Sequence, residues 1–211
     1  MTKCCGNNVK FDGISEDYKR RLWLVIMLNA AMFIIEITAG QVANSQALQA
    51  DALDFLSDAL TYGISLAVIG ASIQARTNAA IFKGLSLALI GVWVLGSTIY
   101  RVFFAEIPEA EIMGAIGFLA LMTNLASVLI LVRYKDGDAN VRSVWLCSRN
   151  DAIGNLAVMI AALSVWGTAS RWPDLIVAAI MSGLFLSSAF QITRQALLER
   201  RESISVKQEG V

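Results

Sequence analysis

Residues Ala50–Asp58 read ADALDFLSD and place three aspartates inside an otherwise apolar segment. Asp51, Asp54 and Asp58 stand at positions i, i+3 and i+7, so a helix would align their carboxyls along one narrow stripe. Each aspartate at the centre of a membrane helix costs about 2.5 to 3.5 kcal/mol on insertion scales. Carboxylates this close cannot all be ionised in a dry environment, so the stripe must hold protons or a cation.

The chain around this stripe has the composition of an integral membrane protein. Of its 211 residues, 56% are hydrophobic and 16% are charged, which is too apolar for a soluble domain. A membrane-spanning helix needs about 20 largely apolar residues. We therefore expect an all-α membrane protein with six transmembrane helices. The expected spans are residues 22–39, 46–71, 79–100, 112–132, 141–166 and 175–198.

The distribution of lysine and arginine predicts the orientation of these spans. Basic residues gather before the first span, after the fourth and after the sixth, and Arg76 and Lys83 mark the connection between the second and third. The opposite side carries only Arg101 and Arg171. By the positive-inside rule, both termini are expected in the cytoplasm. The predicted parts are a cytoplasmic tail (1–21), a transmembrane domain (22–198) and a second short cytoplasmic tail (199–211).

A structural alternative exists for the first aspartate of the stripe. Asp51 could cap a helix that begins near Leu53, because aspartate is a favoured N-cap residue. Asp58 lies too deep for this role, and residues 62–71 alone are too short to span a membrane. For Asp54 and Asp58 we favour a functional interpretation, since ionisable residues inside membranes usually mark ion paths.

The fifth span, like the second, carries an aspartate inside an apolar segment. Asp151 lies inside it, with Cys147 four residues before and Asn155 four residues after on the same helical face. A free cysteine is most often a small buried hydrophobe, but beside a buried aspartate a ligand role is equally open. Residues 57–60 (SDAL) and 150–153 (NDAI) are faintly alike, as in transporters built from inverted three-helix halves.

Other polar and aromatic residues support weaker predictions. Glu36 is expected to reach the headgroups or line an exit, and Asn29 and Asn124 to hydrogen-bond between helices. Cys4 and Cys5 are adjacent in a tail expected to face the reducing cytoplasm, so we predict no disulfide. Aromatic residues at the span ends fit an interfacial belt: Trp23, Tyr100, Tyr134, Trp166 and Trp172.

Over about residues 22–198 the chain resembles the cation diffusion facilitator family of metal-ion/proton antiporters. The segments DFLSD (54–58) and CSRND (147–151) match the two ligand pairs of that family on helices 2 and 5, and ADAL, DAIGN, Asn124 and WPDLIVAAIMSGL match the context. The resemblance implies a tetrahedral site for a transported divalent metal, with these ligands: Asp54, Asp58, Cys147 and Asp151.

The implied function is export of Zn²⁺- or Cd²⁺-like cations from the cytoplasm in exchange for protons, since thiolate ligands select such metals over magnesium or calcium. The implied setting is a bacterial inner (plasma) membrane, with a homodimer formed through the membrane helices. The resemblance implies no enzyme activity and no cofactor, and the net charge of +0 gives no reason to expect a nucleic-acid partner.

Two features depart from the family pattern. The chain has no histidine, so Cys147 occupies the position that is often histidine in zinc transporters. It also ends about a dozen residues after the sixth span, whereas most relatives continue into a cytoplasmic domain. Two alternatives remain: a non-transporting membrane interaction protein with a structural aspartate cluster, and an intramembrane hydrolase that uses paired aspartates.

Overall fold

A computed structural model describes residues 15–68, 73–104, 106–136 and 139–209, and these residues are almost entirely helical. No β-strand occurs in these ranges, so the predicted all-α fold class is confirmed. The elements are α1 (Glu16–Val42), α2 (Gln46–Ala67), α3 (Ile73–Phe104), α4 (Ala110–Leu131), the short 3-10 helix η1 (Val132–Tyr134), α5 (Ala139–Thr168) and α6 (Trp172–Glu209).

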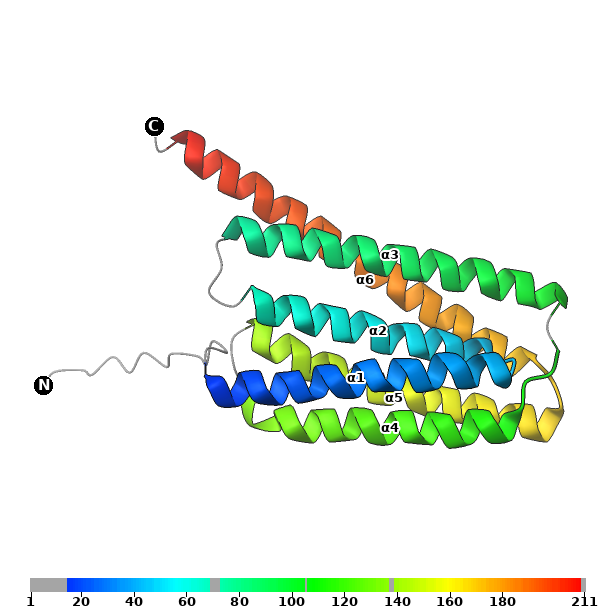
Figure 1. Ribbon diagram of the computed structural model, residues 1–211. Helices are drawn as coiled ribbons and strands as arrows, with labels where there is room; N and C mark the ends of the chain where they lie inside the picture. Colours follow the sequence, from blue (N-terminus) through cyan, green and yellow to red (C-terminus); the bar gives the residue numbers. More distant parts are fainter. Residues whose placement is uncertain (1–14, 69–72, 105, 137–138, 210–211) are drawn as a thin grey trace, which may run out of the picture.

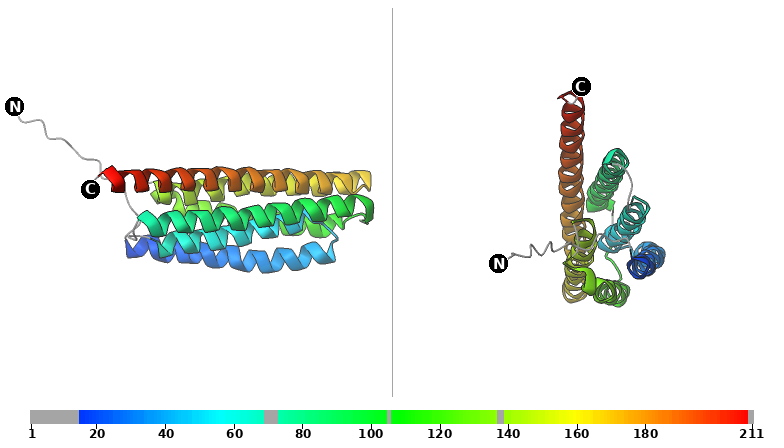
Figure 2. Two further views of the ribbon diagram at one scale, coloured as in Figure 1. Left: turned by 90° about the horizontal axis from the view of Figure 1, so that it is seen from above. Right: turned by 90° about the vertical axis from the view of Figure 1, so that its left-hand side faces the viewer.

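The six long helices run side by side and alternate in direction, so α1 begins and α6 ends at the same end of the bundle (Figure 1). Helices α1, α2, α4 and α5 form a group of four, and α3 packs along α6 beside this group (Figure 2). The α3–α6 pair contacts the group mainly through α2 and α5. The two helices with intramembrane aspartates therefore lie where the pair and the group meet.

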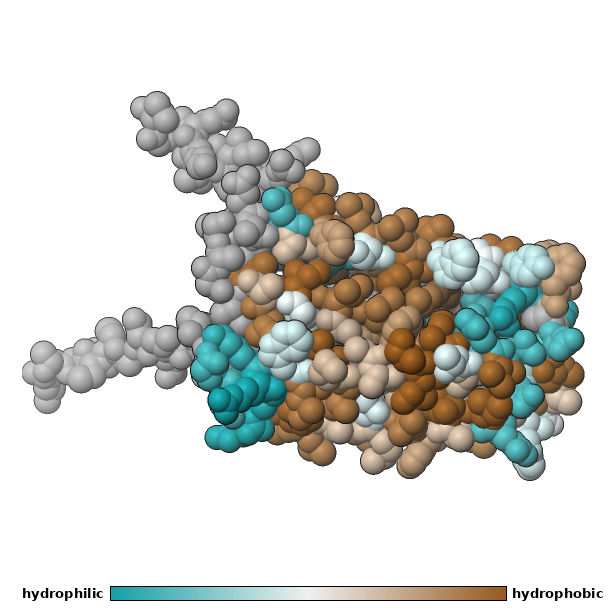
Figure 3. All heavy atoms as spheres, in the orientation of Figure 1, coloured by the Kyte–Doolittle hydropathy of each residue, from teal (hydrophilic) through white to brown (hydrophobic). Residues whose placement is uncertain are grey.

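Five of the long helices are apolar enough, and long enough, to cross a membrane. Helix α2 has 22 residues but is not among these five, because it carries three aspartates. At about 1.5 Å per residue, its length of about 33 Å still matches a hydrocarbon core of about 30 Å. The surface of the bundle is mostly apolar along its middle, with hydrophilic residues gathered toward both ends (Figure 3). The chain is therefore a multi-pass integral membrane protein.

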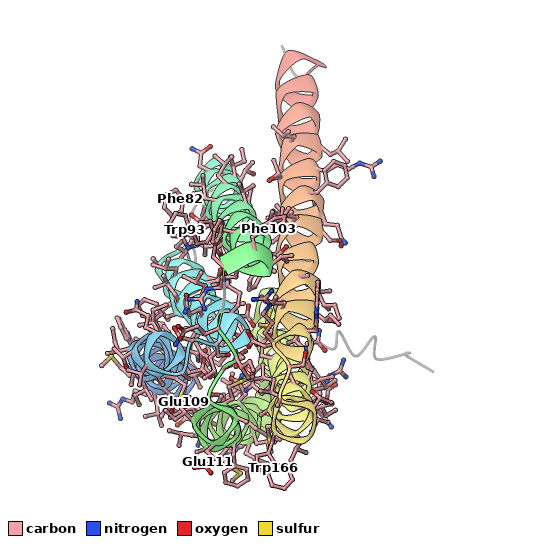
Figure 4. The ribbon with its side chains drawn as sticks, turned by 90° about the vertical axis from the view of Figure 1, so that its right-hand side faces the viewer. Phe82, Trp93, Phe103, Glu109, Glu111 and Trp166 are labelled. Carbon is pink, nitrogen blue, oxygen red and sulfur yellow. The ribbon has the colours of Figure 1, made fainter. Side chains whose placement is uncertain are left out.

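Large aromatic side chains lie on the outside of this bundle. Phe82, Trp93 and Phe103 of α3 are 58%, 72% and 71% exposed, and Trp166 near the end of α5 is exposed as well (Figure 4). Such a surface is costly in water and suits contact with lipid. Of the residues expected in the interfacial belt, Tyr134 instead packs edge-on against a buried tyrosine of α1, with ring centroids 5.0 Å apart. The other four are exposed: Trp23, Tyr100, Trp166 and Trp172.

Helices α1, α3 and α6 extend well beyond the apolar segments that predicted them, and α3 runs over Ile73–Phe104 where residues 79–100 were expected. Helix α1 begins at Glu16, where the Ser15 side chain accepts a hydrogen bond from the Tyr18 amide (3.3 Å). Helix α6 continues past residue 198 to Glu209. Hydropathy marks only the part of a helix that matches the hydrocarbon, whereas backbone hydrogen bonds continue into the polar ends. The predicted end of the second span, residue 71, lies outside the described residues.

Helices α1 and α2 form a tight hairpin. The turn between them is Ala43–Ser45, and Asn44 takes the left-handed backbone conformation (φ 52°) that asparagine tolerates. A Cβ atom on Gly40 would lie only 3.0 Å from the Gln49 side chain, so the glycine allows the two helices to approach closely. The Gln49 amide also donates a hydrogen bond to the Gly40 carbonyl (3.1 Å). We call this end of the bundle, with the Ala43–Ser45 turn and the start of α6, the Ser45 end.

Asp174, near the start of α6, joins α6 to α2 at the Ser45 end. Its Oδ1 accepts hydrogen bonds from the Ser45 hydroxyl (2.6 Å) and the Ala47 amide (3.0 Å), and its Oδ2 accepts from the Gln46 amide (2.8 Å). The side chain is 1% exposed. The first amides of a helix have no partner within the helix, so a carboxylate placed there is a strong cap.

Candidate metal centre

The N-terminus of α2 determines how deep its aspartates lie. Ser45 is the N-cap, and its hydroxyl accepts a hydrogen bond from the Leu48 amide (3.1 Å). Asp51 therefore lies in the second turn, and the alternative that it caps a helix starting near Leu53 is wrong. Asp51 and Asp58 are 1% and 7% exposed, while Asp54 between them is half-buried. The aspartate stripe thus faces the interior of the bundle, as its spacing predicted.

The polar face of α5 lies opposite. The side chains of Ser148 and Asn155 are completely buried, and those of Cys147 and Asp151 are half-buried. The Cys147 thiol is free. Neither polar atom of the Asn155 amide has a hydrogen-bond partner among the described residues, which is unusual for a buried side chain.

The carboxyls of α2 and α5 meet. The Asp151 carboxyl lies within hydrogen-bonding reach of both Asp54 and Asp58. Cys147 lies close enough to both α2 carboxyls for its charge state to affect theirs, and it is within reach of the Tyr62 hydroxyl. The structure thus brings together all four residues of the predicted ligand set.

The four side chains do not converge on one point. Within the described ranges, no three cysteine, aspartate or glutamate side chains are arranged to hold a metal ion as they stand. The carboxyls are instead arranged as hydrogen-bonding neighbours, and Asp151 Oδ2 has no hydrogen-bond partner among these residues. Coordination of one ion by these residues requires their side chains to rotate.

Tyr62 also belongs to this site, although it was not among the predicted site residues. Its hydroxyl donates a hydrogen bond to Asp58 Oδ2 and lies 3.3 Å from the Ser148 hydroxyl and 3.5 Å from the Val144 carbonyl oxygen. Tyr62 is completely buried and joins α2 to α5. Its position four residues after Asp58, on the same face of the helix, is the signal that could have found it.

Lys83 of α3 also lies beside the site. From its place in the sequence, Lys83 was expected among the charges of a cytoplasmic connection. In the structure it is half-buried, its Nζ donates a hydrogen bond to the Ser65 hydroxyl of α2 (3.2 Å), and its charge acts on Asp58 and Cys147. A cation thus stands near the carboxyls on the side away from the Ser45 end.

The remaining polar predictions have mixed outcomes. Glu36 is completely buried and faces Asp51 of α2, so the expectation that it reaches the headgroups is wrong. The Asn29 amide donates to the Val25 carbonyl of its own helix (2.8 Å), and Asn124 is 2% exposed with an unpartnered carbonyl oxygen within the described part. The two adjacent cysteines of the N-terminal tail lie outside the described residues.

Known proteins resemble this chain over most of its length. The family model described as the cation efflux transmembrane domain matches residues 22–199. The chain is 27% identical over 199 residues to a cadmium, cobalt and zinc/H(+)-K(+) antiporter of Bacillus subtilis, covering 85% of this chain and 62% of that protein. It is 26% identical over 200 residues to the zinc transporter ZitB of Escherichia coli, covering 89% and 64%.

A third relative is the metal cation efflux system protein CzcD of Cupriavidus metallidurans, 25% identical over 205 residues, with 92% of this chain and 63% of that protein covered. The chain thus spans less than two thirds of the length of these relatives. The family model matches most of the chain, including α2 and α5. The chain therefore belongs to the cation diffusion facilitator family of cation efflux proteins.

Proposed function

We propose that this protein exports divalent transition-metal cations from the cytoplasm in exchange for protons. The transported ion is held by Asp54 and Asp58 of α2 and by Cys147 and Asp151 of α5. The observation that carries the proposal is the meeting of these carboxyls between two helices of a largely apolar bundle. Ionisable groups inside a membrane are costly and usually serve an ion path.

The donor set suits zinc and cadmium. Three carboxylates and a thiolate combine hard and soft ligands, and the thiolate favours Zn²⁺ and its heavier congeners over Mg²⁺ or Ca²⁺. Relatives named for cadmium, cobalt and zinc support this substrate class. Family membership also supports a transporter and not an enzyme.

Proton exchange follows from the same ligands. Carboxyls held as neighbours in an apolar interior need shared protons to limit their repulsion, and metal binding requires ionised ligands. Each ion that binds therefore displaces protons, and each ion released allows protons to return. A site that opens alternately to the two sides exchanges metal for protons, and inward-directed protons drive the metal outward.

The orientation with both termini in the cytoplasm remains a prediction from the basic residues, and it fits a bundle in which α1 begins and α6 ends at the same end. We further propose that α2 spans the membrane as the sixth helix, that the membrane is a bacterial inner membrane, and that two copies associate through their membrane helices.

The test is zinc uptake into everted membrane vesicles with an imposed pH gradient, acidic inside. We expect uptake by the wild-type protein and its loss in Asp54→Ala, Asp58→Ala and Asp151→Ala at unchanged amounts of protein in the membrane. Glu111→Ala is the matched control, because Glu111 is an exposed carboxylate in the first turn of α4. It should transport at the wild-type rate.

The outcomes separate this proposal from its alternative. Near-normal uptake by Asp58→Ala would remove the assigned site while leaving transport intact. A wild-type protein that moves neither Zn²⁺ nor Cd²⁺ in proteoliposomes would contradict transport altogether. The aspartate cluster would then be structural, as in a membrane interaction protein.

A further inference from the structure

A second pair of acidic side chains meets inside the bundle, between α1 and α2. Glu36 is completely buried, and Asp51 is 1% exposed. Neither carboxyl oxygen of Glu36 accepts a hydrogen bond from a donor group of the described residues, and the same holds for Asp51 Oδ2. We call Glu36 and Asp51 the acid pair.

The hairpin geometry brings these two carboxyls together. Glu36 lies one turn before Gly40, where α1 and α2 approach closely, and Asp51 lies two residues after Gln49, which bonds to Gly40. Asp51 is near enough to Glu36 for a carboxyl–carboxyl hydrogen bond. Such a bond needs one proton, because two ionised carboxylates offer no donor.

Other charges do not neutralise the acid pair. Among the described residues, no lysine or arginine acts on Glu36 or Asp51; the other charge that acts on Glu36 is the Asp54 carboxyl. Helix α4, which also packs on α1, places Met113, Ala120 and the neutral Asn124 in the core. Two buried negative charges without a cation repel each other and lose hydration, so one shared proton is the favourable state.

We propose that the acid pair is a proton-binding site, distinct from the four candidate metal ligands, that holds one shared proton when the metal site is empty and releases it when a divalent cation binds. The inference rests on the proposed function, which supplies the cation. Asp51 stands three residues before Asp54, on the side of the Ser45 end. Where the four ligands together release fewer than two protons, the incoming divalent cation raises the charge beside Asp51, and in a medium of low dielectric this favours loss of the pair's proton.

The order in which entering protons reach the two sites follows from the position of the pair. The acid pair lies between the metal site and the Ser45 end, which is the non-cytoplasmic end if both termini are cytoplasmic. Protons that enter from that end reach the acid pair before the metal ligands. The pair would thus add one proton to the number exchanged for each metal ion.

The test uses the full-length protein in nanodiscs and the variant Glu36→Gln. Glutamine keeps the shape of the side chain and donates an amide hydrogen to Asp51, but it cannot share an acidic proton. Asp51→Asn provides the same test from the other helix, should one variant fold poorly. Glu111→Gln serves as the control, since its carboxylate is exposed.

The first measurement needs no metal. Infrared spectra at neutral pH report the carbonyl stretch of protonated carboxylic acids, and we expect Glu36→Gln to lose the amplitude of one acid relative to the wild type. An unchanged spectrum in both Glu36→Gln and Asp51→Asn would mean that the pair holds no proton, and the proposal would be overturned.

The second measurement is titration calorimetry with Zn²⁺ in buffers of different ionisation enthalpy, which counts protons released per ion. We expect the count to fall by about one in Glu36→Gln at unchanged binding stoichiometry. An equal count in variant and wild type would refute the coupling. If the wild type binds no zinc, the proposed function fails, whereas the infrared comparison still decides whether the acid pair holds a proton.

Discussion

Replacing Asp174 by alanine should loosen the Ser45 end. The variant removes all three hydrogen bonds that this carboxylate accepts, and it leaves the amides of Gln46 and Ala47 without their partner. Both residues are buried, at 2% and 0% exposure, so water cannot replace the carboxylate without a local rearrangement. Ser45 would still cap α2 through Leu48, so the helix itself should persist.

The size of the effect follows from the three orphaned donors, which are two backbone amides and the buried Ser45 hydroxyl. A buried donor without a partner costs about 1 to 3 kcal/mol, so three donors cost about 3 to 9 kcal/mol. Removal of a buried carboxylate returns part of this free energy, because the carboxylate itself was desolvated on folding. We therefore expect Asp174→Ala to lower the free energy of unfolding by about 3 kcal/mol.

Asparagine at the same position provides a graded comparison. Asp174→Asn keeps an acceptor oxygen for the Ser45 hydroxyl and the Ala47 amide, which both bond to Oδ1, and loses the bond from the Gln46 amide to Oδ2. The loss of one hydrogen bond should lower the free energy of unfolding by about 1 to 2 kcal/mol. The order of stability should be wild type, then Asn, then Ala.

The assay is equilibrium unfolding in mixed micelles with increasing SDS, followed by tryptophan fluorescence. Glu111→Ala is the control and should stay within about 0.5 kcal/mol of the wild type, because it changes an exposed carboxylate at the same end of the bundle. The reasoning is refuted if Asp174→Ala is as stable as this control, or if Asn and Ala are equally damaging.

Three further predictions concern the metal site and the helix contacts. Cys147→Ser should lower cadmium uptake more than zinc uptake at matched protein levels, because a soft anion is replaced by a hard hydroxyl; an unchanged cadmium-to-zinc ratio removes sulfur from the site. Tyr62→Phe loses a hydrogen bond to a buried carboxyl worth about 1.5 kcal/mol, so the KM for zinc uptake should rise about tenfold, and an unchanged KM argues against an orienting role. Gly91→Ala should destabilise the α3–α6 contact by about 1 to 3 kcal/mol in the SDS assay, since its Cβ would lie 2.9 Å from Leu186, whereas Gly96→Ala meets open space and should not destabilise; equal effects contradict the packing argument.

The helices were predictable because apolar segments of the right length are a strong signal. The second helix was the hard case, since its aspartates lower its hydropathy, yet the depth of Asp58 required a helix that begins well before it. The interior orientation of the aspartate stripe followed from helical spacing alone. The polar extension of α6 to Glu209 has no apolar pattern, and for that reason it was missed.

Contacts between distant residues could not be predicted from spacing. Asp174 bonds to Ser45, 129 positions earlier in the chain, and nothing near either residue indicates the other. The partner of Glu36 depends on how closely α1 approaches α2, which the hairpin and Gly40 determine. Periodicity assigns a side chain to a face of its own helix, while the neighbouring helix decides what that face contacts.

The tight hairpin of α1 and α2 has a consequence for how the chain enters the bilayer. Three aspartates at about 2.5 to 3.5 kcal/mol each would burden α2 by about 8 to 10 kcal/mol if it partitioned into lipid alone. The apolar α1 precedes it by only the Ala43–Ser45 turn, and its Glu36 faces Asp51. We therefore expect α2 to leave the translocon together with α1, as a helical hairpin. Its acidic face would stay out of contact with lipid until α5 has been synthesised.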